Sequence, residues 1–110
     1  MMAGEWNLAY STFFELTKVY PDFEWPYGNL GSMCIRDGNL KEAKNLLKKA
    51  LSINPYYINA WYHLCRAHLL SSEIDDAQNC LDEIVNIDPS DDNLEGMRIA
   101  LKSVAEWSDS

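Results

Sequence analysis

Apolar and polar positions follow the spacing of amphipathic helices along most of the chain. In residues 40–53, one helix face collects the apolar residues Leu40, Leu47, Ala50, Leu51 and Ile53. Most of the lysines in that segment fall on the opposite face, as expected of a helix that covers a core. No segment alternates between apolar and polar residues for long enough to predict a strand. The pattern therefore predicts an all-α fold.

Groups of turn residues divide this pattern into separate helices. Residues 37–39 and 71–73 interrupt the apolar periodicity, and the pairs Asn54-Pro55 and Asp88-Pro89 end one helix before the next begins. These boundaries predict helices at 4–20, 24–37, 40–53, 58–71, 74–87 and 91–107.

The chain also repeats itself at a fixed distance. Matched residues stand 34 positions apart throughout the middle of the sequence: Tyr27 and Trp61, Leu30 and Leu64, Ala43 and Ala77, Leu47 and Leu81, Pro55 and Pro89. A fixed period of this length indicates stacked supersecondary units, none of which can bury its apolar face alone.

These positions resemble the tetratricopeptide repeat (TPR) pattern, in which Trp-x-x-Leu-Gly-x-x-Tyr is followed by an Ala, an aromatic residue and a closing Pro. Trp61 and Leu64 match it, as do Leu30 and Gly31 one unit earlier. The second unit departs from it, because a Cys and a His replace the Gly and the Tyr. The resemblance implies antiparallel helix pairs stacked into a short right-handed superhelix.

The same register predicts how the chain is divided. A single domain, 1–110, contains full repeats at 24–57 and 58–91. Residues 4–21 match only the second helix of a unit and form a half repeat, and 92–107 form a polar terminal helix that caps the stack. The half-repeat start also fits a fragment of a larger TPR protein.

Composition limits the classes of partner. A formal charge of −8 argues against nucleic acid, since phosphate backbones select basic surfaces. The apolar stretches are too short to span a membrane, and no secretory signal opens the chain. The cysteine positions favour a reducing, cytoplasmic setting. Cys34 and Cys65 are expected to face neighbouring helices, and Cys80 to lie on the outer part of its helix and react sooner with thiol reagents.

Charged clusters have structural explanations. The lysines of 40–53 are expected to solubilise a helix face. The acidic residues around 88–95 are expected to favour the start of the last helix through its dipole, because their spacing is not that of a calcium loop.

Little in the sequence supports catalysis. His63 and His68 are five residues apart on one helix, which separates them by about 140° around its axis. They therefore cannot share one metal or relay one proton without a partner from elsewhere. Cys65 between them occupies a packing position, so an enzyme built on these three residues is a remote alternative. No catalytic residue, cofactor or metal is expected.

The resemblance implies that the first helix of each pair lines a concave face that binds a segment of a partner protein. Once the packing positions are set aside, the predicted groove residues are Trp25, Asn29, Ser32, Arg36, Asn59, Tyr62, His63, Arg66 and Leu70. Their amides can pair with an extended backbone, and the two arginines can hold an acidic group. The two-carboxylate clamp of chaperone-binding TPR domains is missing, since Gly28, Ser32, Asn93 and Met97 stand at its positions.

Assembly is the alternative to peptide binding. The half repeat leaves aromatic surface without a covering helix, and exposed apolar patches often mark interfaces. Trp6, Tyr10 and Phe14 are the predicted contact residues of such an interface. The expected oligomeric state is a monomer or a weak homodimer.

Overall fold

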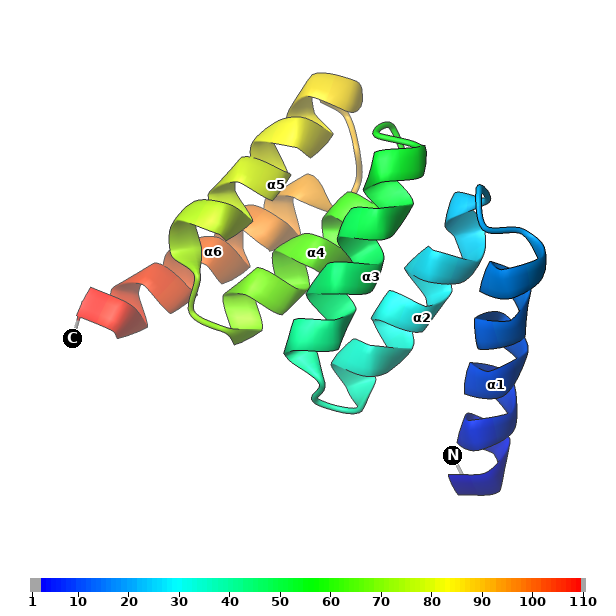
Figure 1. The fold of residues 1–110 in the computed structure, drawn as a ribbon. Helices are drawn as coiled ribbons and strands as arrows, with labels where there is room; N and C mark the ends of the chain where they lie inside the picture. Colours follow the sequence, from blue (N-terminus) through cyan, green and yellow to red (C-terminus); the bar gives the residue numbers. More distant parts are fainter. Residues whose placement is uncertain (1–2, 110) are drawn as a thin grey trace.

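The computed structural model describes the backbone of residues 3–109 and the side chains of residues 8–107. The described backbone forms only helices and the turns that join them: α1 (Ala3–Val19), α2 (Glu24–Arg36), α3 (Leu40–Ile53), α4 (Ile58–Leu70), α5 (Ile74–Ile87) and α6 (Leu94–Asp109). Figure 1 shows them stacked in chain order from α1 at one end to α6 at the other. The predicted all-α fold is confirmed, with nearly all helix boundaries within one residue of those expected.

The start of α6 differs more. It begins at Leu94 rather than at 91, because two short turns precede it. The Asp88 carboxylate accepts the Ser90 backbone N–H at 3.1 Å, and the Asp91 carboxylate accepts the Asn93 N–H at 2.9 Å. Aspartate commonly holds such turns, and they delay the helix by three residues.

The turns inside the two helix pairs have the same geometry. Gly38 and Ser72, which are 34 residues apart, both take a positive φ, of 80° and 58° respectively. In each turn the next residue donates its N–H to the carbonyl five positions earlier: Asn39 to Cys34 at 2.9 Å, and Glu73 to His68 at 2.8 Å. This is the helix ending that a left-handed residue permits. The period seen in the sequence is therefore also a period of the backbone.

Small residues set the distance between paired helices. Ala43 and Ala77 are fully buried where the second helix of each pair approaches the first. A Cβ added to Gly31 would lie 2.6 Å from Leu47 Cγ, so α2 and α3 meet at a point that admits no side chain. In the second pair Cys65 takes that place, with its Sγ 3.5 Å from the Ala77 carbonyl oxygen. The second pair fits a larger residue at the same position.

The outer position predicted for Cys80 is wrong. Its side chain is only 3% exposed and belongs to the same core cluster as Cys34 and Cys65, whose predicted burial is confirmed. The cause is that α5 has neighbours on two sides, since it pairs with α4 and also packs against α6. A helix covered from two directions buries a wider arc than one amphipathic stripe.

The lysine face also differs from expectation at one position. Lys44 is largely buried, and its ammonium group contacts Glu73 Oε1 at 2.8 Å and Ser71 Oγ at 3.2 Å, both in the α4–α5 turn. Lys41, Lys48 and Lys49 are exposed as predicted. Lys44 thus ties α3 to the following pair.

Candidate peptide-binding groove

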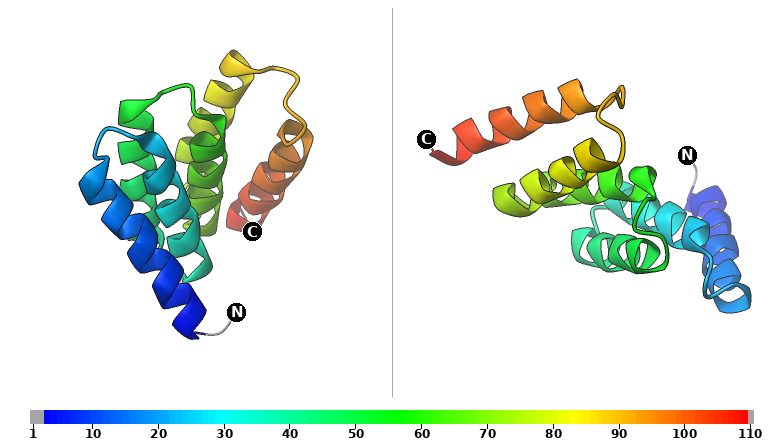
Figure 2. Two further views of the ribbon diagram at one scale, coloured as in Figure 1. Left: turned by 90° about the vertical axis from the view of Figure 1, so that its right-hand side faces the viewer. Right: turned by 90° about the horizontal axis from the view of Figure 1, so that it is seen from above.

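The inner side of the stack is formed by the first helices of the pairs. Helix α2 contacts α4, and α4 contacts α6, whereas α1, α3 and α5 make no such contacts with one another within the described residues. Figure 2 shows the stack from two further sides, with α1 and α6 at its opposite ends. Because the first helices lie closer together, the stack bends toward their side. The face on which they lie is the concave one.

The predicted groove residues are all accessible to a ligand, to different degrees. Trp25, Arg36, Asn59 and Leu70 are exposed, and the remaining members are half-buried: Asn29, Ser32, Tyr62, His63 and Arg66. Trp25 also takes part in packing, since its ring meets that of Phe13 edge-on at 5.3 Å and helps to hold α1 against α2. The Asn29 amide is partly engaged, because it donates to the Trp25 carbonyl at 2.9 Å.

A cationic group forms the middle of this face. Arg66 Nη1 donates to His63 Nδ1 at 3.3 Å, and the Arg66 guanidinium lies 5.9 Å from the centre of the Tyr62 ring. Burial lowers the pKa of His63 to about 4, with further contributions from the positive charges of Arg66 and Arg36. The imidazole is therefore neutral at pH 7 and can accept the guanidinium hydrogen bond.

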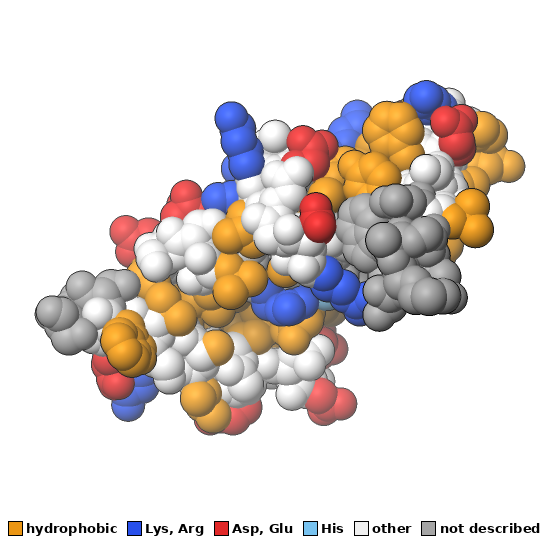
Figure 3. Space-filling view, turned by 90° about the horizontal axis from the view of Figure 1, so that it is seen from below, with side chains coloured by type: hydrophobic (Ala, Val, Ile, Leu, Met, Phe, Trp, Pro, Cys, Tyr) orange, Lys and Arg blue, Asp and Glu red, His pale blue; other side chains and the backbone are white. Residues whose placement is uncertain are grey.

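Arg36 and Arg66 have no carboxylate partner in the part of the chain whose side chains are described. Within the described residues, no acidic oxygen lies within 4.0 Å of Arg36 or Arg66, although Lys18, Lys44 and Arg98 each have such a partner. Several exposed lysines also lack an acid among the described residues, but Arg36 and Arg66 differ from them in that both lower the pKa of the half-buried His63. In Figure 3, basic and hydrophobic side chains lie together in the hollow of the molecule. An anion can therefore bind in the hollow without displacing a carboxylate of the described residues.

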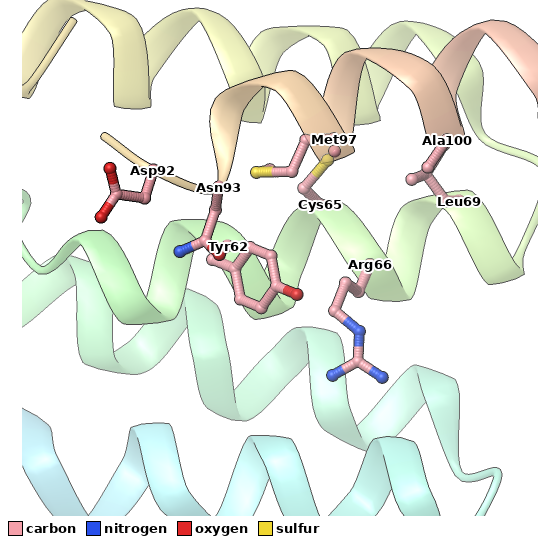
Figure 4. A pocket seen from close by; sticks show the side chains of 9 residues that line it. Tyr62, Cys65, Arg66, Leu69, Asp92, Asn93, Met97 and Ala100 are labelled. Carbon is pink, nitrogen blue, oxygen red and sulfur yellow. The ribbon is translucent and has the colours of Figure 1, made fainter. Parts of the chain in front are cut away.

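Two adjoining hollows extend this face between α4 and α6. The first has a volume of about 360 Å³ and is lined by Tyr62, Cys65, Arg66 and Leu69 of α4 and by Asp92, Asn93, Gly96, Met97 and Ala100 from the α6 side. Figure 4 shows the Tyr62 ring and the Arg66 guanidinium projecting from α4, with Asn93 facing Tyr62 from the α6 side. The second hollow, of about 270 Å³, is lined by Arg66, Leu69, Leu70, Ala100 and Val104.

The sequence places Asn93 and Met97 only as replacements in a chaperone clamp and does not predict the rest of the α6 side of these hollows. Glu95, Arg98 and Ile99 replace the repeat signature in that segment, so the pattern predicts only a cap. The available signal was the small pair Gly96 and Ala100, four residues apart and hence on one helix face. Small residues on a helix that faces another helix leave space between them.

The other titratable cluster is a structural link between repeats. His68, Glu73 and Asp76 lie close enough together to be considered as metal ligands. However, Glu73 Oε1 already accepts hydrogen bonds from Lys44 Nζ at 2.8 Å and from His68 Nδ1 at 2.9 Å. These bonds lower the pKa of Glu73 to about 2, and the bond from Lys44 makes the largest contribution. The lysine ammonium supplies the cation at this carboxylate, which leaves no reason to place a metal there.

The aromatic residues of α1 are described only in part. Phe14 is 44% exposed, and its ring lies 6.3 Å from that of Tyr10, which is half-buried. The Trp6 side chain lies outside the described residues. Leu8 and Val19 add further apolar surface at 70% and 64% exposure. This end of the stack has more uncovered apolar surface than the sequence pattern indicated.

Comparison with known families decides the identity of the fold. The family model described as tetratricopeptide repeat matches residues 35–98, which is more than half of the chain. The chain belongs to the tetratricopeptide repeat family. The matched region includes most of both predicted TPR units and the first part of α6.

Solved TPR structures share the whole architecture. The first TPR of Spaghetti (RPAP3), bound to the HSP90 peptide SRMEEVD, superposes with a TM-score of 0.85 at 15% identity, covering 97% of this chain and 82% of that one. The TPR2B domain of yeast Sti1, in a complex with pHsp70, gives 0.82 at 17% identity, covering 94% and 86%. At these identities the likeness establishes the fold alone. A search of curated proteins finds no match, and no described helix is long and apolar enough to cross a membrane.

Proposed function

We propose that this TPR domain binds an acidic segment of a partner protein along its concave face, and that it has no catalytic activity. The observation that carries the proposal is that two arginines on the concave face, Arg36 and Arg66, have no carboxylate partner among the described residues. Arg36 and Arg66 lie on successive first helices, and both act on His63. An arginine can form two parallel hydrogen bonds with a carboxylate, which gives both affinity and orientation.

The surroundings of the arginines suit a peptide rather than a small anion. Tyr62 offers an aromatic surface, and Asn29 and Asn59 can each donate to and accept from a peptide backbone. A TPR domain with the same fold holds the acidic peptide SRMEEVD. In this chain the acidic group would meet Arg36 and Arg66 rather than the positions of the chaperone clamp, where Gly28 and Ser32 stand.

Three further parts of the proposal concern the chain as a whole. We propose that it is one domain, divided into a half repeat at 4–21, full repeats at 24–57 and 58–91 and a terminal helix at 92–107. We propose a cytoplasmic location, which the free and buried cysteines Cys34, Cys65 and Cys80 favour. We also propose that neither nucleic acid nor a bilayer is the partner, in keeping with the charge of −8.

The test is a titration of the labelled chain, followed by NMR, with two capped peptides of equal length. One contains two adjacent aspartates in a Ser/Gly background, and the other has asparagines in their place. The acidic peptide should shift the amide signals of Asn29, Asn59, His63 and Arg66 together and leave those around Lys48 unchanged. The neutral peptide should cause much smaller shifts.

Matched arginine variants separate specific binding from general attraction. Arg66→Ala or Arg36→Ala should weaken the acidic peptide by about 1–3 kcal/mol, the magnitude of a charge-assisted pair. Arg98→Ala removes the same charge from the exposed side of α6, where Arg98 lies 3.9 Å from Glu95, and should leave affinity unchanged. Equal losses for all three variants would show non-specific attraction and refute the proposal.

Assembly through α1 is the second candidate. It is favoured by the exposed apolar residues at that end of the stack: Leu8, Phe14, Val19, Tyr20 and Phe23. Exposed patches of this kind often mark interfaces. Sedimentation equilibrium of the parent and of Phe14→Ser tests it. A dimer that is lost in the variant supports assembly, whereas a monomer at every concentration excludes it.

A further inference from the structure

The terminal helix α6 is well packed on one side and borders a hollow on another. It packs mainly on α5 and contacts α4 at few points. Between α6 and α4 lies the second hollow described above, whose lining is apolar apart from Arg66. Leu70 at its edge is 60% exposed. An apolar hollow beside an exposed leucine is a costly surface to leave in water.

The residues on the α6 side are small. Ala100 lines both hollows, and Gly96 lines the first. A Cβ added at Gly96 would meet no atom within 4 Å. Because these two residues have little or no side chain, they leave the space between α6 and α4 unfilled. A helix that served only to close the stack would instead carry larger residues here, because filling such a space with apolar atoms stabilises a fold.

Arg66 connects the apolar hollow to the cationic group. It lines both hollows, bonds to His63 and has no acidic partner within the described residues. A segment whose carboxylate pairs with Arg66 would therefore hold its neighbouring residues beside the space between Leu69, Leu70, Ala100 and Val104. The charge fixes the position of the ligand, and the hollow selects the side chain next to it.

We infer that the hollow between α4 and α6 is a second subsite of the groove, which takes an apolar side chain from the same acidic segment that Arg36 and Arg66 hold. This inference rests on the proposed function. The ligand class it names is a segment in which a carboxylate and a side chain of about the size of leucine lie within a few residues of each other. Helix α6 then serves as a wall of the binding site as well as the end of the stack.

The experiment uses the full 110-residue chain and three capped peptides of equal length in a Ser/Gly background. The first contains an aspartate and a leucine two residues apart, the second an aspartate and a serine, and the third an asparagine and a leucine. On the parent protein, the first should bind about tenfold more tightly than the second, because burial of one leucine side chain supplies at least that factor. The third should bind weakly. The first peptide alone should shift signals of Leu69, Ala100 and Val104.

Two variants test the subsite itself, with a control on the same helix. Ala100→Phe fills the hollow, and Leu70→Ser removes apolar surface at an exposed position where folding is not at risk. Each should abolish most of the tenfold advantage that the leucine peptide has over the serine peptide. Ser103→Phe adds the same ring at an exposed position that lines neither hollow, and should change nothing.

The possible failures are distinguishable. If both aspartate peptides shift His63 and Arg66 equally and bind equally well, the subsite is refuted and the proposed function stands. If no peptide shifts that face, the proposed function fails as well. If the parent self-associates, and Leu70→Ser or Ala100→Phe prevents this, then the hollow is filled by a second copy of the chain and the inference is overturned.

Discussion

The close approach of α2 and α3 gives the most direct test of the packing. Gly31 is buried, and a Cβ built on it would lie 2.6 Å from Leu47 Cγ and 2.8 Å from Leu47 Cδ2. Both distances are shorter than the non-bonded carbon–carbon contacts found in folded proteins. Leu47 is fully buried and cannot turn toward solvent to make room. Gly31→Ala must therefore shift Leu47 or move the two helices apart.

Two opposing contributions to the free energy of unfolding decide whether Gly31→Ala destabilises the protein. Forcing an extra methyl group into a filled core costs about 1–3 kcal/mol. Replacing Gly by Ala inside a helix returns about 1 kcal/mol through its higher helix propensity. The net expectation is a loss of up to about 2 kcal/mol in the free energy of unfolding, because the steric cost exceeds the gain in helix propensity. For a domain of this size, a loss of about 2 kcal/mol lowers Tm by about 8 °C.

The assay is urea unfolding followed by far-ultraviolet circular dichroism. Gly96→Ala on α6 is the matched control, since its new Cβ would meet nothing within 4 Å and the variant should gain up to about 1 kcal/mol. Leu47→Ala removes the obstructing side chain, so the double variant Gly31→Ala/Leu47→Ala should be more stable than the two single losses predict. An unfolding midpoint for Gly31→Ala at or above that of the parent would refute the reasoning, as would strict additivity in the double variant.

Three further predictions concern titratable groups. Burial raises the pKa of the Cys34 thiol, and it raises the pKa of Cys65 to about 11 and that of Cys80 to about 12. A thiol reagent should therefore label all three only as fast as the protein opens, and rapid labelling of any one under native conditions would contradict their burial. Because hydrogen bonds to Lys44 and His68 lower the pKa of Glu73 from 4.5 to about 2, its contribution to stability is present above pH 4.5 and is lost as the pH falls toward 2. Glu73→Gln should show a smaller drop in urea midpoint between pH 7 and pH 3 than the parent, and an unchanged drop would argue against the link. The His63 ring should titrate at about pH 4 by NMR, because burial and then the charges of Arg66 and Arg36 disfavour its protonation. Arg66→Ala should raise this pKa toward the ordinary 6.5, with burial keeping it below that value.

The sequence by itself determined the architecture, because repetition is a local property. A helix pair that cannot bury its own apolar face must stack on a copy of itself, so a period of 34 residues specifies the fold wherever the pattern recurs. The left-handed turn shows how local this information is. Gly38 and Ser72 take the same backbone conformation at the same register, and the turn residues around them were visible in the sequence.

The tertiary structure decided the features that depend on more than one neighbour. Cys80 is buried because α5 is covered from two sides. Lys44 is linked to the next helix pair because its ammonium group pairs with the Glu73 carboxylate at 2.8 Å. Neither fact is visible in the periodicity of one helix, which defines a face but not what covers it. The same holds for the hollow beside Arg66. Its shape follows from how far α6 lies from α4, and that distance is set by the packing of α6 on α5 rather than by any motif of its own.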